Sequence, residues 1–351
     1  ISGNFEVQNM DKLFDQDNSG RLTIGWIDDH HVLTALHNLN GGWSLERVDY
    51  AYHTRQTIAS FDQNLFLFNL SPNGSGLSAY VTETETEPSP ALREKKIIHE
   101  LLYVRLNASG EPDLVKVGKN DEKRTYWLGS QNVWSNNGRY LSGYFARNTE
   151  TLQDMLFVYD VEQDETLEYA LPEWLYDTII SMVKISDDGS HAILVTYAEK
   201  QPHIVFGELR GSRFIGQYER PVNRAGVVDF VNDNQIMFIG PDYSLNVYDH
   251  RGETTTVLLE QIASFRLSKD GAAIAYTKNG EDLYAARLEG SQMLEETLVF
   301  KGDLPQRYDW SPDGQKLLLY DSNPRELTPD MIAEPHQKAD VRSFPIVLEF
   351  E

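Results

Sequence analysis

A short unit recurs along this chain and limits the folds that are open to it. Its clearest copy runs from Tyr308 to Tyr320 and contains Ser-Pro-Asp-Gly between two apolar segments. Tyr308 and Trp310 alternate around Asp309, as side chains do along a strand. Pro presets φ at the second position of a turn, and Gly tolerates positive φ. The unit therefore predicts a strand, a tight turn and a second strand.

Seven copies of this unit align on the residue before the turn. Four of the other copies keep the Gly, one has Asn234 in its place, and the first has His30 and is the most divergent. Asn can adopt the left-handed conformation, so the turn at Asn234 survives without Gly. The mean spacing is about 47 residues, near the period of a propeller blade. The anchors are Trp26, Leu70, Trp134, Ile185, Phe230, Leu267 and Trp310.

Each turn is followed by an apolar run of strand length, and further strands follow in several copies. Third strands are predicted at 155–160, 245–249 and 282–286, and fourth strands at 165–170 and 254–259. Four antiparallel strands in each repeat describe a β-propeller blade. We therefore predict an all-β, seven-bladed β-propeller, with six or eight blades as alternatives. The second strands are predicted at 32–36, 77–81, 140–145, 192–197, 236–239, 273–277 and 316–320.

The Trp-Ser-Pro-Asp-Gly unit with its apolar strand resembles the WD40-like repeat of TolB-type propellers. Similar units occur in the propellers of prolyl-oligopeptidase-type peptidases. The resemblance covers most of the chain as a repeat, and it implies a protein of the bacterial cell envelope. The Gly-His and Trp-Asp signatures of eukaryotic WD40 repeats are absent. Propellers host unrelated activities, so the resemblance implies a fold more than a function.

The chain start is predicted to complete the last repeat. That repeat has strands at 306–310, 316–320 and 343–350 but no obvious fourth, whereas 5–9 alternates like a strand. Pairing the two would close the propeller and remove an exposed sheet edge. A propeller also allows residues 1–351 to form a single domain, because each blade packs only on its neighbours.

Composition excludes several function classes. A formal net charge of −23 disfavours nucleic acid and anionic lipid as partners. The absence of cysteine excludes disulfides, thiol catalysis and Cys-ligated metals. No apolar run is long enough to span a bilayer. The chain begins with Ile1, from which we expect that a secretory or lipoprotein signal has been removed, giving an extracytoplasmic protein.

Two stretches near the chain start raise the question of a metal. Residues 15–23 resemble the start of an EF-hand loop, but its twelfth position is Trp26 instead of Glu, so we favour a polar turn. His31 and His37 share a strand face, whereas His30 points to the other face, which leaves a zinc site open as an alternative to rim histidines. We therefore predict no metal and no cofactor.

Three connections interrupt the repeats. Residues 82–96, with Pro88 and Pro90, are predicted to form a long polar loop. Residues 322–341 form a second long connection, with a helical turn expected near 328–333. A third, 172–177, contains Trp174 and Tyr176 and predicts one helical turn. These aromatics could stack on a ligand, but packing between blades is the default expectation.

No enzyme motif is recognisable. The Gly-x-Ser-x-Gly elbow of hydrolases, the P-loop and HExxH are absent. Aspartates in the turns are expected to accept backbone hydrogen bonds and not to act in catalysis. We predict a monomeric, non-catalytic binding or scaffold protein that holds a protein, peptide or glycan near the channel. The alternatives are a lyase or hydrolase, suggested by the acidic charge and the His-Asp cluster at 28–37, and an extracytoplasmic sensor domain.

Overall fold

The computed structural model contains two compact units. The first unit comprises residues 1–34, 47–56 and 221–351, and the second comprises 35–46 and 57–220. The residues that the structure describes are 5–13, 21–38, 42–62, 65–85, 96–106, 113–119, 124–128, 133–147, 154–176, 178–198, 201–224, 227–278, 282–290, 292–303, 307–324 and 344–350.

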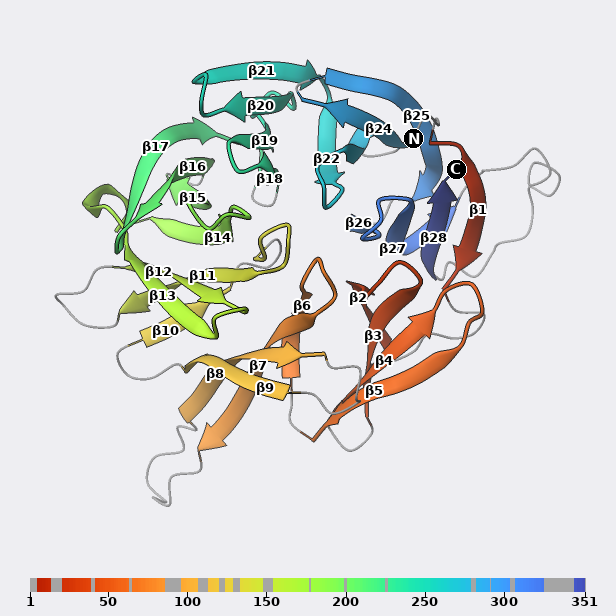
Figure 1. The fold of residues 1–351 in the computed structure, drawn as a ribbon, viewed down its shortest axis with the longest axis horizontal. Coiled ribbons are helices and arrows are strands. Elements are labelled where there is room, and N and C mark those ends of the chain that lie inside the picture. The colour runs from red at the N-terminus through yellow and green to blue at the C-terminus, as the bar shows by residue number, and fades with distance from the viewer. Residues whose placement is uncertain are drawn as a thin grey trace. The chain divides into compact units, whose positions relative to one another are not determined.

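Regular structure in the described residues is β-strand, apart from the 3-10 turn η1 (Glu173–Leu175) (Figure 1). This confirms the predicted all-β class and the helical turn beside Pro172. No helical segment in these residues has the length and hydropathy that a bilayer span requires.

Three sheets in the described part of the chain have four strands in sequence order. Meander order is expected where apolar runs are separated by short turns. They are β2 (Arg21–Trp26), β3 (His31–His37), β4 (Trp43–Asp49) and β5 (Arg55–Phe61); β6 (Leu65–Leu70), β7 (Gly76–Glu85), β8 (Lys96–Arg105) and β9 (Asp113–Lys119); and β18 (Val228–Asn232), β19 (Gln235–Ile239), β20 (Leu245–Asp249) and β21 (Thr254–Leu259).

One eight-stranded sheet, in the second unit, consists of two sets of four strands joined at one residue pair. The join is a parallel contact between Ala170 and Arg213. Its strands are β10 (Arg124–Trp127), β11 (Tyr140–Arg147), β12 (Met155–Asp160), β13 (Glu165–Ala170), β14 (Ile179–Ile185), β15 (His191–Ala198), β16 (Gln201–Arg210) and β17 (Arg213–Pro221).

The other eight-stranded sheet also contains two antiparallel sets. They join where Gly302 and Asp303 of β25 pair with Pro324 and Asn323 of β27. Its strands are β22 (Ile262–Leu267), β23 (Ala273–Lys278), β24 (Asp282–Glu289), β25 (Gln292–Asp303), β26 (Tyr308–Trp310), β27 (Lys316–Pro324), β28 (Phe344–Phe350) and β1 (Val7–Lys12).

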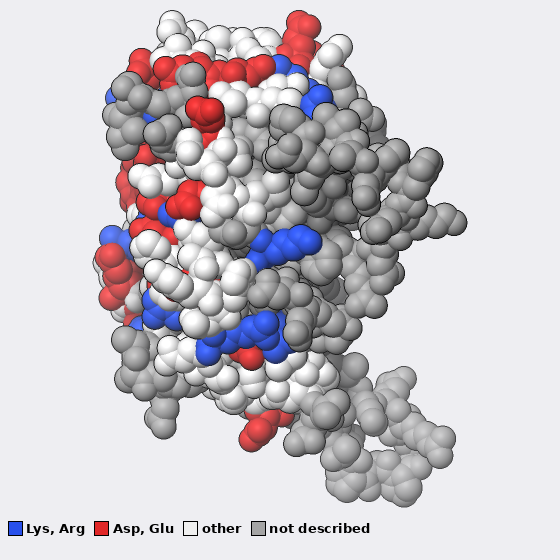
Figure 2. All heavy atoms as spheres, turned by 90° about the vertical axis from the view of Figure 1, so that its right-hand side faces the viewer, with Lys and Arg blue, Asp and Glu red and all other residues white. Residues whose placement is uncertain are grey.

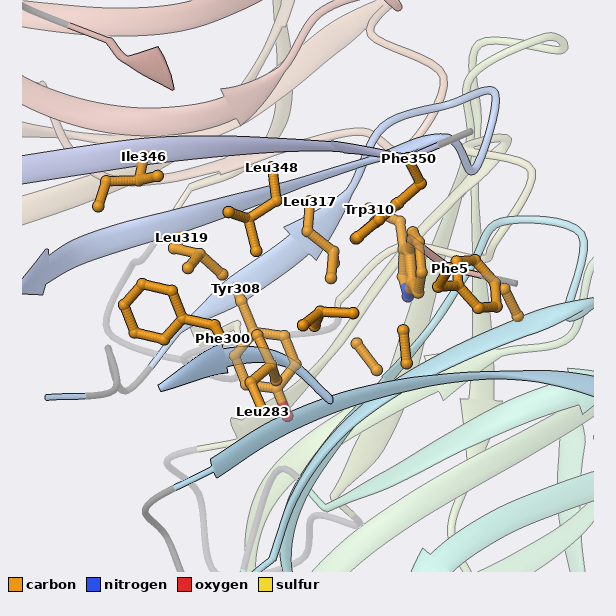
Figure 3. Close-up of a cluster of buried hydrophobic side chains, with 14 residues drawn as sticks. Phe5, Leu283, Phe300, Tyr308, Trp310, Leu317, Leu319, Ile346, Leu348 and Phe350 are labelled. Carbon is orange, nitrogen blue, oxygen red and sulfur yellow. The ribbon is translucent and has the colours of Figure 1, made fainter. Parts of the chain in front are cut away.

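The N-terminal strand joins the C-terminal repeat, as predicted. β1 pairs antiparallel with β28, with Met10 opposite Leu348, and the red and dark-blue strands lie side by side in Figure 1. The strand begins two residues later than the predicted 5–9. Phe5 instead packs its ring against Trp310 and Phe350, with centroids 5.6 and 5.4 Å away (Figure 3). The N-terminal segment therefore contributes both the strand β1 and the buried side chain of Phe5.

Most predicted strands match the structure, and the errors lie at connections. The strands at 155–160, 165–170, 245–249 and 254–259 are found with the predicted bounds. The loop prediction for 82–96 is wrong at its ends, because β7 continues to Glu85 and β8 begins at Lys96. The β7–β8 ladder continues through this extension with four residue pairs, from Thr82 opposite His99 to Glu85 opposite Lys96, so backbone pairing outweighs the low β propensity of the acidic residues.

The second long connection also begins later than predicted. The strand predicted at 316–320 extends to Pro324, within the connection predicted to begin at 322. Residues 86–95 and the expected turn at 328–333 lie outside the described residues.

Charge on the molecular surface is mixed in sign. On the face drawn in Figure 2, Asp and Glu gather along one margin, with Lys and Arg among them. Acidic side chains are therefore unevenly distributed over the described part of this face.

Candidate functional site

The repeated turns are held by one hydrogen-bond pattern. In the last copy, Ser311 Oγ donates to Asp313 Oδ1 at 2.5 Å, and the Gln315 N–H donates to the same carboxylate oxygen at 3.0 Å. The Lys316 N–H in turn donates to Ser311 Oγ at 2.9 Å. Gly314 completes the turn with φ of 68°. The same bonds recur at Ser71, Ser135, Ser186 and Ser268.

This pattern gives the turn aspartates a structural role, as the sequence predicted. It also explains why Asn replaces Asp in two copies, since only an acceptor oxygen is required. Asn adds a donor that Asp lacks. Asn73 Nδ2 donates to Asn137 O at 3.0 Å, and Asn137 Nδ2 donates to Asp187 O at 3.0 Å. Three consecutive turns of the second unit are thereby linked.

A hollow of about 320 Å³ lies between the first two of these turns, within the second unit. We call it the Arg139 hollow. Its volume falls at the lower end of the range of small-molecule sites. It is lined by Asn73, Ser75, Tyr103, Arg105, Asn137, Gly138, Arg139, Val161 and Glu162. Because the linked turns form one wall, the hollow is supported by rigid backbone.

Arg139 is held in place by two carboxylates. Its Nε and Nη2 contact Asp160 Oδ1 and Oδ2 at 3.1 and 2.7 Å, and its Nη1 lies 3.1 Å from Glu162 Oε2. Burial opposes ionisation of Asp160, but bonds from Arg139 and from two backbone N–H groups outweigh it and lower its pKa. Asp160 is buried, whereas the Glu162 side chain is 67% exposed. Glu162 is therefore the accessible acceptor of the hollow.

Arg105 supplies a second guanidinium. Its Nη1 contacts Asp113 Oδ2 at 3.1 Å, and its Cζ lies 6.0 Å from the ring centroid of Tyr103. Both partners of this ion pair are more than one-third exposed, so the pair adds little stability. Exchanging this ion pair for a contact with a ligand would therefore cost little stability.

Tyr103 also lines the hollow, and we call this residue the floor. The residue is fully buried, and its ring contacts Trp134 and Tyr159 with centroids 5.8 Å away in each case. Its hydroxyl has no hydrogen-bond partner among the described residues. Gly76 makes room for the ring, because a Cβ at that position would clash with it. A buried polar group without a partner is costly and calls for an explanation.

A second cluster lies in the first unit around His31. His31 Nδ1 is 2.7 Å from Asp28 Oδ1, and its Nε2 is 3.8 Å from Asp49 Oδ2. Arg47 Nη2 contacts Asp28 Oδ2 at 2.5 Å. Burial raises the pKa of Asp28, but N–H bonds and the neighbouring His31 and Arg47 lower it overall. An adjoining hollow of about 170 Å³ is lined by His31, Arg47, Asp49, Thr54, Arg55 and Gln56.

The sequence pointed to a His-Asp cluster at 28–37, and the structure brings together only part of it, Asp28 and His31. Asp28 accepts the N–H groups of His30 and His31, as a turn aspartate does. His30 is exposed, and His37 instead contacts the Trp43 ring, with centroids 5.0 Å apart. Asp28 thus orients an imidazole beside a small hollow. Of the polar turn predicted at 15–23, residues 15–20 lie outside the described residues, whereas 21–23 begin β2.

A third polar cluster has a structural explanation. Tyr320 is buried, and its hydroxyl donates to Asp309 Oδ2 and Ile24 O at 2.9 and 3.1 Å. The Arg307 guanidinium lies 4.3 Å from the Tyr320 ring centroid and donates to Ile24 O at 2.8 Å. Burial raises the pKa of Tyr320 well above its ordinary value, although Arg307 opposes this. These bonds join β2 to the last repeat.

The two aromatic residues singled out near η1, Trp174 and Tyr176, lie in different environments. Trp174 is 52% exposed, whereas Tyr176 packs against a buried core cluster. Sequence reasoning did not single out the residues of the Arg139 hollow. A signal existed in the two adjacent copies that carry Asn73 and Asn137, where the five other copies carry Asp. The remaining residues come from β8 and from turns that lie far apart in the sequence, and no motif connects them.

Comparisons with known proteins support the fold. No family model and no curated protein sequence matches the chain. One similar solved structure is an oligogalacturonate lyase in complex with manganese, with a TM-score of 0.64 and 11% identity, covering 100% of this chain and 95% of that one. Another is the C-terminal WD40 domain of Sif2, with a TM-score of 0.50 and 12% identity, covering 98% and 99%.

At these identities the likeness concerns architecture alone. The assignment to TolB-type repeats therefore stays a prediction. Together with the four-stranded antiparallel sheets, the likeness shows that the chain has the β-propeller fold.

Proposed function

We propose that this protein is a non-catalytic binding propeller and that its ligand, a segment of protein, peptide or glycan, occupies the Arg139 hollow. The observation that carries the proposal is the combination of a hollow of ligand size with a frame of linked turns. Ordered backbone lowers the entropy cost of binding. The hollow offers hydrogen-bond donors from Arg105 and Arg139 and an exposed acceptor in Glu162.

The test is to fill the hollow. Val161→Trp places an indole at its wall, next to the β12 end, and Arg251→Trp places one on an exposed hairpin turn as a matched control. Purified protein is applied to immobilised glycan and peptide arrays. We expect a selective signal that Val161→Trp removes and Arg251→Trp keeps. A signal that both variants keep equally would contradict the proposal, as would no signal at all.

A second candidate function is catalysis at the His31 cluster. It is favoured by the Asp28–His31 contact, which resembles a carboxylate orienting a general base. The fold shared with an oligogalacturonate lyase gives a substrate to try. We would incubate the protein with oligogalacturonate, with and without manganese, and analyse products by mass spectrometry. Product formation that His31→Gln abolishes would favour this function over the binding one.

We infer that the propeller has seven blades. The support is the seven sequence anchors, together with three four-stranded sheets and two eight-stranded sheets that each divide into two sets at a narrow join. The joins involve one pair and two pairs of residues, whereas even the short ladder of β26 with β27, which lies within a set, has three pairs. Six or eight blades remain the alternatives, and an experimental structure would decide among them.

We also propose an extracytoplasmic location at the bacterial cell envelope, on the basis of the resemblance to TolB-type propellers, and a monomeric state. Cell fractionation of the source organism with an antibody against the protein tests the location. Recovery in the cytosolic fraction would contradict it. A sensor role remains an alternative, and the sequence of the complete gene would test it.

A further inference from the structure

We propose that the Arg139 hollow recognises a neutral, hydroxyl-rich unit of a glycan, such as one uncharged sugar ring. This inference rests on the proposed binding function and specifies its ligand class. Three properties of the hollow support it: the balance of charge, the kind of hydrogen-bonding groups at the rim, and the buried Tyr103 hydroxyl, which has no partner among the described residues.

Charge disfavours an ionic ligand. The hollow contains two guanidinium groups, but both are already paired: Arg139 with Asp160 and Glu162, and Arg105 with Asp113. Two cations and three carboxylates leave a slight negative excess, in a protein of net charge −23. A carboxylate or phosphate ligand would be repelled by this negative excess, and an amine would be repelled by the two guanidinium groups. A neutral ligand avoids both penalties.

The hydrogen-bonding groups match hydroxyls. A sugar hydroxyl both donates and accepts, so it needs neighbouring acceptors and donors. The Glu162 carboxylate is 67% exposed, and Arg105 and Ser75 lie on the same lining. Planar guanidinium and carboxylate groups can each engage two adjacent oxygens. The lining therefore presents both kinds of partner within one hollow.

The floor provides an additional donor. The Tyr103 hydroxyl is buried and has no partner among the described residues. A ligand oxygen at the floor of the hollow would satisfy it. The hydroxyl is itself covered, so this contact requires a small movement of the side chains above it. If this hydroxyl lacks a hydrogen bond in the free protein and gains one on binding, the bound state is favoured.

The experiment is calorimetric titration with three probes of similar size: a neutral hexose disaccharide, a uronic acid disaccharide and an amino-sugar disaccharide. We expect the neutral probe to bind most tightly and its affinity to be insensitive to salt, since charged ligands bind through interactions that salt screens. Tighter binding of either charged probe, or a strong salt dependence of the neutral one, would overturn the inference.

Two rim variants test the assigned groups. Glu162→Ala and Arg105→Met should each weaken binding of the neutral disaccharide about threefold to tenfold, the effect of one lost hydrogen bond. Both side chains are partly exposed, so the melting temperature should stay nearly unchanged. Unchanged affinity in both variants would contradict the assignment.

Tyr103→Phe separates a binding role from a structural one. It should weaken binding about threefold to tenfold without lowering stability, because the hydroxyl removed has no partner among the described residues. Tyr308→Phe is the matched control: its buried hydroxyl contacts Ser264 Oγ at 2.9 Å, so it should lower stability and leave binding intact. Equal affinity of Tyr103→Phe and the parent protein would contradict the floor contact.

The outcomes distinguish a failure of the proposed binding function from a failure of the neutral-glycan inference. If a peptide or charged glycan binds and Val161→Trp abolishes that binding, the binding function stands and the neutral-glycan inference fails. If neutral disaccharides bind but Val161→Trp has no effect, the hollow is not the site and both fail.

Discussion

Among single residues, the turn acceptor has the most general role, because each well-formed copy of the repeat depends on one acceptor oxygen. In the fourth copy, Asp188 Oδ1 accepts the Ser190 N–H at 2.9 Å and the hydroxyls of Ser186 and Ser190 at 2.7 Å each. The sequence shows that Asn can occupy this position, as at Asn137. The amide retains the acceptor but loses the charge, so the two contributions can be separated by mutation.

Asp188→Ala should lower the free energy of unfolding by about 1–2 kcal/mol, the typical cost of losing a capping acceptor. Asp188→Asn should cost less than half of this, because its Oδ1 can accept the same bonds. Urea denaturation at neutral pH measures both values. Equal losses for the two substitutions would mean that the charge, and not the acceptor, holds the turn.

The same residue predicts a dependence on acid. Burial opposes ionisation of Asp188, but hydrogen bonds from Ser190 and Ser186 outweigh it and lower its pKa in the folded protein. A lowered pKa contributes stability that is present above the unfolded pKa of about 3.9 and is lost as pH falls through the folded value. Asp188→Asn should therefore lose less stability than the parent between neutral pH and about pH 3, measured by urea denaturation across that range.

Paired and unpaired tyrosine hydroxyls should respond differently to removal. Tyr320→Phe deletes bonds to Asp309 and to Ile24 O and leaves their oxygens without this donor, so it should cost about 1–3 kcal/mol. Tyr103→Phe deletes a hydroxyl without a described partner and should be neutral or stabilising. Thermal or urea unfolding of both variants provides the comparison, and a large loss in Tyr103→Phe would show that its hydroxyl has a partner.

Among the elements, the tryptophans that precede the turns tie neighbouring repeats together. The Nε1 groups of Trp26, Trp134 and Trp310 donate to Asp309 O, Asn69 O and Arg266 O at 3.2, 3.0 and 3.1 Å. In each case the acceptor is the carbonyl of a residue in the preceding repeat, counting the last repeat as the one before the first. The ring is buried while its N–H finds a partner, which is the usual requirement for buried tryptophan.

Trp134→Phe should therefore lower the free energy of unfolding by about 2–4 kcal/mol, through lost packing and an unpaired carbonyl. Trp174→Phe is the matched control, because Trp174 is 52% exposed and its loss should cost less than about 0.5 kcal/mol. Urea denaturation distinguishes them. Comparable losses at the two positions would contradict the role assigned to the indole N–H.

Across the chain as a whole, the first and last segments meet in one sheet. β1 covers the edge of β28, and Phe5 packs against Trp310 and Phe350 (Figure 3). Without β1, the backbone groups of β28 along this edge would be unpaired, and such an edge promotes aggregation. The chain ends therefore contribute to solubility as well as to stability.

Removal of residues 1–12 should produce a protein that aggregates and unfolds at a lower temperature. Phe5→Ala, which keeps the strand, should cost about 3–5 kcal/mol but leave the protein soluble, because only packing is lost. Size-exclusion chromatography and thermal unfolding measure both effects. A truncated protein that stays soluble and equally stable would show that β1 is dispensable.

The fold class, the turn chemistry and most strand bounds follow from the amino-acid sequence. The turn residues, which are Ser, Asp or Asn, and Gly, interact with backbone groups no more than five residues away. Their roles can therefore be predicted without a structure. Pairing of the chain start with the chain end was also predictable, because one repeat lacked a strand. The stretches after Val81 and Tyr320 were misjudged, since cross-strand pairing extends the strands there beyond what local propensity indicates.

The candidate site, in contrast, exists only in the folded chain. Tyr103 and Arg105 share one face of β8, but Arg139 and Glu162 come from other connections, and nothing in the sequence predicts that the three parts meet. Register places Tyr103 opposite Ser78, its ring packs against Trp134, and its buried hydroxyl has no partner among the described residues. A local pattern records what a residue does to its own backbone, whereas a binding site depends on side chains that only long-range packing brings together.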